Sequence, residues 1–157
     1  MSWVFWAILA AAALHVVEEY YFPGGSLEAL KGFQPNYASF ITVPFAVVIN
    51  GLFLLLCLAG ALLSGIAPVF SLSVAATVGL NGLIHIGAAI KSKGYVPGVG
   101  TGVVFYLPLA ACAFVLFHRA GNAAFRSALL AVLLAVLYQA VPICCLVLAR
   151  RLKNNQS

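Results

Sequence analysis

The segment WVFWAILAAAALHVVEEYYF (residues 3–22) decides how this chain folds. Its first twelve residues carry no charge, and one histidine and two adjacent glutamates then follow within five positions. The whole chain has only three acidic residues, and two of them, Glu18 and Glu19, lie here. An apolar helix of about 20 residues is long enough to cross the hydrocarbon core of a bilayer. The segment therefore predicts a membrane-spanning helix with a polar group near one end.

The composition of the rest of the chain agrees with a membrane protein. Its 157 residues are 64% hydrophobic and 7% charged, with a mean hydropathy of +1.12. A soluble globular domain is roughly half apolar and about a quarter charged. We therefore predict an all-α, polytopic integral membrane helix bundle that forms one domain over residues 1–157. The net charge of +5 comes from basic residues at helix ends, which favours membrane lipids over nucleic acid as partners.

Five apolar runs are long enough to span a membrane. Proline, glycine, asparagine or charged residues separate them, as is typical of loops. The longest loop, PGGSLEALKGFQPN (residues 23–36), has room for a short interfacial turn around residues 27–30. The predicted spans are residues 2–22, 37–63, 67–90, 99–117 and 125–148.

The distribution of basic residues predicts the orientation of these spans. An odd number of spans places the two termini on opposite sides of the membrane. Arg119 and Arg126 lie on one side, and the positive-inside rule places the more basic side in the cytoplasm. We therefore expect the amino terminus outside the cytoplasmic membrane and the carboxyl terminus in the cytoplasm. The six basic residues expected on the cytoplasmic side are Lys31, Lys91, Lys93, Arg150, Arg151 and Lys153.

Polar residues of two spans are expected at the same depth in the membrane. The first and third spans run in the same direction, and His15, Glu18 and Glu19 lie near the inner end of the first. Asn81 and His85 lie near the inner end of the third, four residues apart and so on one helix face. Two imidazoles and two carboxylates are suitable ligands for zinc or iron. The pattern predicts a divalent metal site, either zinc or iron, whose ligands are His15, Glu18, Glu19 and His85.

Structural interpretations of the same residues stay open. The glutamates could mark the water boundary beside an aromatic belt, and His85 could be an interior histidine that hydrogen-bonds Asn81. Asn50, in the middle of the second span, could join two helices by a hydrogen bond. In the functional interpretation, Asn81 and Asn50 bind substrate.

Three short motifs carry a resemblance to a known family. They are HVVEE (residues 15–19), NGLIH (81–85) and YVPG (95–98). Over about residues 5–115 the chain resembles the HXXEE-motif family of small bacterial integral membrane proteins, which implies a bacterial inner membrane. The resemblance also implies that Tyr95, Pro97 and Gly98 belong to the site, Gly98 as a substrate-binding residue. Pro97-Gly98 suits a tight turn, with positive φ at Gly98 if the turn is type II.

We expect a metal-dependent membrane enzyme that acts on a lipid or another apolar small molecule. Hydrolase, isomerase and oxidoreductase chemistry all fit. The catalytic residues would be Glu18, Glu19 and Tyr95, with one glutamate as general base and the tyrosine as proton donor or oxyanion partner. A version without metal would use the same residues for acid–base isomerisation.

Two other classes of function compete with an enzyme. One alternative is a small transporter or carrier that binds a cation or protons at the same cluster. Five short spans give such a machine little room unless the chain forms a homo-oligomer. Another alternative is a structural subunit of a larger complex.

The predicted topology can be tested with reporter fusions or cysteine labelling. Ser157 is expected on the cytoplasmic side and residues beside Arg119 on the outer side, because a single span, residues 125–148, separates these two positions. If both positions were found on one side, the count of five spans would be wrong and the two polar clusters would lose their shared depth.

Overall fold

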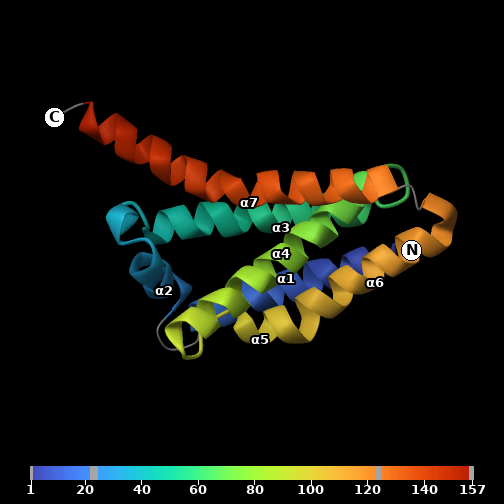
Figure 1. The fold of residues 1–157 in the computed structure, drawn as a ribbon, viewed down its shortest axis with the longest axis horizontal. Coiled ribbons are helices and arrows are strands. Elements are labelled where there is room, and N and C mark those ends of the chain that lie inside the picture. The colour runs from blue at the N-terminus through green and yellow to red at the C-terminus, as the bar shows by residue number, and fades with distance from the viewer. Residues whose placement is uncertain (1, 22–24, 123–124, 156–157) are drawn as a thin grey trace.

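The computed structural model describes residues 2–21, 25–122 and 125–155, and it is a bundle of long helices (Figure 1). Within these residues there is no β-strand, and five helices are long and apolar enough to cross a membrane. The predicted all-α fold with five spans is confirmed, and the helices are those of a multi-pass membrane protein. The spans are α1 (Trp3–Tyr21), α3 (Val43–Leu62), α4 (Pro68–Ser92), the segment Val99–Gly121 and α7 (Phe125–Asn154).

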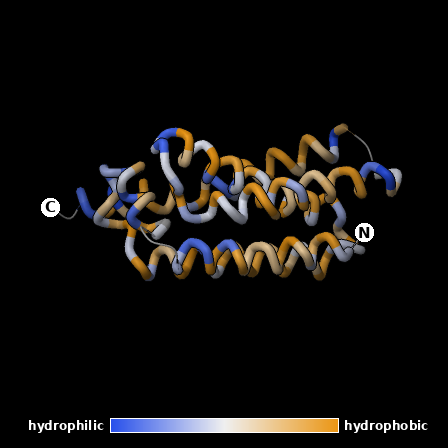
Figure 2. Tube along the Cα trace, turned by 90° about the horizontal axis from the view of Figure 1, so that it is seen from below, coloured by the Kyte–Doolittle hydropathy of each residue, from blue (hydrophilic) through white to orange (hydrophobic). Residues whose placement is uncertain are grey.

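Helix α4 lies at the centre of the bundle. Helices α1, α4 and α7 run in one direction, and α3 and the fourth span return in the other (Figure 1). In an apolar 18-residue stretch of α4, 56% is buried inside the protein. The corresponding stretches of α3 and of α7 are each 17% buried. Val74 and Val78 of α4 pack in one core cluster with Phe5 and Ile8 of α1. Hydrophobic residues follow the helices along their length, and hydrophilic residues gather mainly toward the two ends (Figure 2).

The second span is shorter than the sequence predicted. It begins at Val43, because the Thr42 hydroxyl accepts a hydrogen bond from the Phe45 N–H at 3.4 Å and Pro44 occupies the first turn. The preceding residues form the short 3₁₀ helix η1 (Pro35–Tyr37). The predicted interfacial turn is the two-turn helix α2 (Ser26–Phe33). Residue 22, the predicted end of the first span, lies outside the described residues.

The fourth span changes its helical geometry along its length. It consists of α5 (Val99–Thr101), the π-helical segment η2 (Gly102–Tyr106), α6 (Leu107–Phe117) and a second π-helical segment, η3 (His118–Asn122). Segments of π-helix are rare and often lie at functional sites. Segment η2 packs on α4 with almost no side chain between the backbones, since a Cβ atom at Gly82 would lie 3.2 Å from the Gly102 carbonyl oxygen.

Gly82→Leu should destabilise the protein, because the added side chain would push η2 away from α4. Overpacking of this kind costs about 1–3 kcal/mol. Gly87→Leu is the matched control on the same helix, since a Cβ there meets nothing within 4 Å. Thermal unfolding of both variants in detergent measures the difference. Equal unfolding temperatures would contradict the close contact of α4 and η2.

Candidate functional site

Three side chains from two helices, one buried and two only slightly exposed, converge at the predicted site. His15 and Glu19 come from α1 and His85 from α4, and their potential ligand atoms all lie within 4.8 Å of one another. The Glu19 Oε1 atom is 3.7 Å from His15 Nε2 and 3.4 Å from His85 Nε2. The two imidazole rings meet edge to face, with centroids 4.7 Å apart. The structure therefore brings these three predicted ligands together at one depth.

The spacing of these atoms suits a metal ion better than direct hydrogen bonds. A charged hydrogen bond between imidazole and carboxylate would be about 2.7–2.9 Å long, and both separations are longer. Two atoms that each lie about 2.1 Å from one tetrahedral ion are about 3.4 Å apart. The two imidazoles and the carboxylate thus have the chemistry of metal ligands, and the two distances from Glu19 are close to ligand spacing.

Other groups orient all three side chains. His15 Nδ1 lies 2.7 Å from the Thr101 hydroxyl oxygen. The Pro97 carbonyl accepts a hydrogen bond from the His85 ring. Asn50 donates to Glu19 Oε2 at 3.0 Å, which leaves Oε1 toward the histidines. Metal-binding histidines and carboxylates usually have outer partners of this kind, because these partners set the ring orientation and the tautomer.

Glu18 has a different surrounding from Glu19. Its Oε1 atom accepts hydrogen bonds from the Gly100 N–H at 3.0 Å and from the Tyr95 hydroxyl. Its Oε2 atom accepts one from the Thr101 N–H at 2.8 Å. Both carboxylate oxygens are therefore occupied, and Glu18 is not part of the converging triad. The sequence placed both glutamates at the site, whereas the structure favours Glu19 as the ligand.

The turn between α4 and the fourth span lies directly on the two imidazoles. The Val99 N–H bonds to the Val96 carbonyl at 3.0 Å, and Gly98 has φ 95° and ψ −16°. The predicted positive φ at Gly98 is confirmed. A Cβ atom there would lie 2.6 Å from the His85 ring and 2.7 Å from His15. Only glycine therefore suits this position, and Gly98 contacts the histidines.

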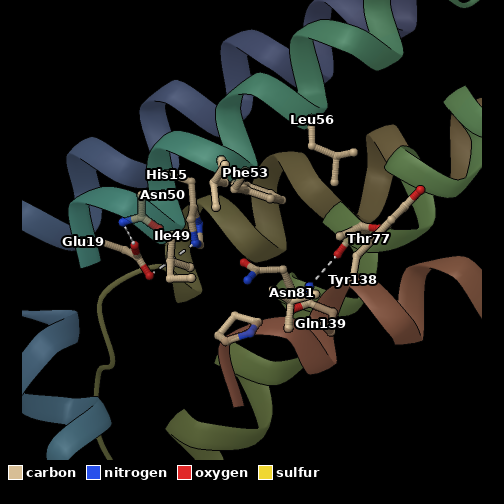
Figure 3. A pocket seen from close by; sticks show the side chains of 13 residues that line it. His15, Glu19, Ile49, Asn50, Phe53, Leu56, Thr77, Asn81, Tyr138 and Gln139 are labelled. Atoms are coloured by element: carbon tan, nitrogen blue, oxygen red, sulfur yellow. Dashed lines mark hydrogen bonds and ion pairs between the residues drawn. The ribbon is translucent and has the colours of Figure 1, made fainter. Parts of the chain in front are cut away.

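Two adjoining cavities, of about 250 and 360 Å³, lie beside the triad. Of the residues predicted to form the site, Glu19, Asn50 and Asn81 line both cavities. His15 lines the smaller and His85 the larger one. Figure 3 shows how the side chains from α1, α3, α4 and α7 face the smaller cavity. Among the predicted site residues, Glu18, Tyr95 and Gly98 line neither.

The structure adds two residues that sequence reasoning missed. Thr101 contacts both His15 and Glu18, and nothing in its local sequence marks it. The Tyr106 ring stacks on His15 with centroids 4.5 Å apart, and its side chain is fully buried. A polar residue in the apolar run of the fourth span was the available signal for Tyr106. Among the described residues, no group hydrogen-bonds the buried Tyr106 hydroxyl or the buried Asn81 Oδ1.

Comparison with protein families gives one match. A family model described as "Protein of unknown function with HXXEE motif" matches residues 6–113. The matched region contains the triad, the Pro97-Gly98 turn and the Glu18 contacts. No curated protein and no solved structure matches the chain.

Glu18→Gln should weaken the hydrogen bond from the Tyr95 hydroxyl, because a neutral amide oxygen replaces the carboxylate. Burial and the hydrogen bond to the Glu18 carboxylate raise the pKa of Tyr95 to about 12. The folded state therefore holds this proton more tightly, and the associated stability is present below about pH 10 and lost as the pH rises through about 12. In the variant, the pKa of Tyr95 should fall toward about 10. Tyrosinate absorbance of each protein, after subtraction of the matching Tyr95→Phe background, measures it.

Thermal unfolding of the same variant provides a second readout. Loss of charged hydrogen bonds should lower the stability by at least about 1.5 kcal/mol. Glu28→Gln is the matched control, because within the described residues Glu28 forms an exposed pair with Lys31 at 2.7 Å, and such pairs contribute about 0–1 kcal/mol. An unchanged Tyr95 titration, or equal stability loss in both variants, would show that Glu18 does not anchor the turn.

Proposed function

The chain belongs to the HXXEE-motif family, whose function is unknown, so an activity has to be inferred from the site, and we propose a metal-dependent membrane enzyme. Its substrate would be a lipid or another apolar small molecule. One observation carries the proposal: His15, Glu19 and His85 converge at the wall of a cavity between membrane helices. Buried ionisable residues in a membrane bundle are costly, and they commonly mark functional sites.

Two metals suit this set of ligands. Catalytic zinc commonly has three protein ligands and an open fourth position. Two histidines and one carboxylate are also the ligands of many iron(II) oxygenases. Bound here, the metal would supply Lewis acidity, an activated water or, with iron, redox chemistry. Hydrolysis, isomerisation and oxidation are thus all compatible with the proposal.

The other residues of the site would orient these ligands and the substrate. Asn50 holds the Glu19 carboxylate, and Thr101 bonds to His15, so both ligands are ordered in advance. Asn81 faces both cavities and is the residue best placed to bind a polar group of the substrate. Glu18 and Tyr95 bond each other. We therefore propose that this pair positions the turn, in place of the base and proton donor expected from the sequence.

The proposed enzyme would have its site near the cytoplasmic face of the inner membrane. His85 lies less than two helical turns before Lys91, so the site shares one end of the bundle with most of the basic residues. At this end the Lys91 ammonium lies over the Phe33 ring, 5.6 Å from the ring centroid. The Arg150 guanidinium lies over the Tyr37 ring, 5.5 Å from its centroid. The positive-inside rule places this end in the cytoplasm.

Elemental analysis of the protein, purified in detergent without chelator, tests the metal. We expect one equivalent of zinc or iron in the wild type, and loss of the metal in His15→Ala, His85→Ala and Glu19→Gln. Asn50→Leu should retain a site whose affinity is about 10–100-fold weaker, since it removes an outer partner of a ligand. A chelator competition measures this affinity.

Two controls separate the ligands from other polar residues. His118→Ala removes an exposed histidine of η3 and should keep the metal. Glu18→Gln should also keep the metal but bind it more weakly, because Glu18 lies outside the triad yet holds Thr101 beside His15. A wild type that binds neither zinc nor iron would reject the metal and leave acid–base chemistry by the same residues. Bound metal that is carried across proteoliposomes would favour the transporter.

A further inference from the structure

The two cavities beside the triad form one elongated binding region. They share the lining residues Glu19, Ile49, Asn50, Asn81, Gln139 and Pro142. The smaller extends toward Phe53 and Leu56 of α3, and the larger toward Phe33 and Leu146. Residues of α3 and α7 line both cavities, and these two spans are the least buried inside the protein. A ligand in this region would thus have access to the lipid phase.

Among the residues that the structure describes, no lysine or arginine lines either cavity. Apart from the histidines, Glu19 is the only ionisable residue other than tyrosine in the described part of their walls. Lys91 and Arg150 stack on Phe33 and Tyr37, but neither cation lines the larger cavity. A buried anion needs a partner charge or several hydrogen-bond donors. A divalent ion at the triad, with Glu19 as its one carboxylate ligand, would leave a net charge of +1, so the walls disfavour an anionic ligand only in the protein without metal.

Asn81, which lines both cavities, has an acceptor that needs a donor. Asn81 Oδ1 is buried, and among the described residues no group donates to it. Pro142 lines both cavities inside α7, and its ring has no N–H for the Tyr138 carbonyl one turn earlier. Gln139 already donates to the Thr77 carbonyl at 2.9 Å. A hydroxyl or N–H group on a ligand would satisfy Asn81 without placing a charge beside Glu19.

We infer that the binding region holds a single-chain, uncharged amphiphile with a hydrogen-bond-donating head, such as a long-chain alcohol. The head would bond to Asn81 beside the triad, and the chain would lie between α3 and α7. As a substrate assignment this rests on the proposed function, whereas binding itself does not require a metal. The inference thus specifies an uncharged ligand whose head lies at Asn81.

Photocrosslinking of the purified protein with a diazirine-bearing hexadecanol tests the inference. Mass spectrometry should place the label on α3 and α7 residues that line the cavities. Excess hexadecanol should remove the label, whereas excess palmitate at pH 8 should not do so in chelator-treated protein. Asn81→Leu should weaken hexadecanol binding at least about fivefold, since a buried hydrogen bond is lost.

Two variants of α3 distinguish the cavity from the lipid-facing surface. Ala46→Phe would fill the larger cavity, which Ala46 lines, and should abolish the label there. Val48 lies two residues further along α3 and is 58% exposed. Val48→Phe should therefore leave the cavity label unchanged. If Ala46→Phe does not fold, the wild-type competition and Asn81→Leu still decide.

The outcomes separate this inference from the proposed metal. Label confined to lipid-facing residues or unchanged binding in Asn81→Leu would overturn the inference, even if metal is bound. Equal competition by palmitate in chelator-treated protein would also overturn it. Cavity label that hexadecanol alone displaces, in a protein without metal, would support the inference and reject the metal. Metal content is therefore measured on the same preparations.

Discussion

The position of the Glu18 carboxylate determines much of the site. A carboxylate that is only 7% exposed inside a helix bundle is costly unless several donors hydrogen-bond to it. Glu18 finds three donors in the first residues of the fourth span and in the Tyr95 hydroxyl. These bonds hold the start of the fourth span against the end of α1. Thr101 is thereby placed beside His15, and the Pro97-Gly98 turn lies over both imidazoles.

This arrangement gives the two adjacent glutamates separate tasks. Consecutive residues of a helix point about 100° apart, so Glu18 and Glu19 face different neighbours. Glu18 faces the fourth span and is saturated with hydrogen bonds. Glu19 faces His85, Asn50 and the cavities, and its Oε1 atom is left for the histidines. In the proposed metal site, anchoring and ligand binding would therefore be divided between two identical side chains.

Glycines let the backbones come close enough for these contacts. A Cβ at Gly100 would lie 3.1 Å from Glu18 Oε1, and one at Gly98 would overlap both imidazoles. Gly82 and Gly102 similarly allow α4 and η2 to touch. In a membrane, where apolar surfaces gain little by leaving lipid, close packing of this kind is a principal source of helix association. The polar site and its tight packing thus depend on each other.

The sequence by itself determined the five spans, because long apolar runs have few alternatives to membrane helices. It also determined that His15, Glu19 and His85 would share one depth, since spans one and three must run in the same direction. The positive φ of Gly98 followed from the Pro-Gly pair. Only the tertiary structure decided that Glu18 would leave the triad, and that Thr101 and Tyr106 would contact His15. The physical reason is that the membrane depth of a residue follows from its position along its own helix. The neighbours that its side chain meets depend on how the surrounding helices rotate and pack.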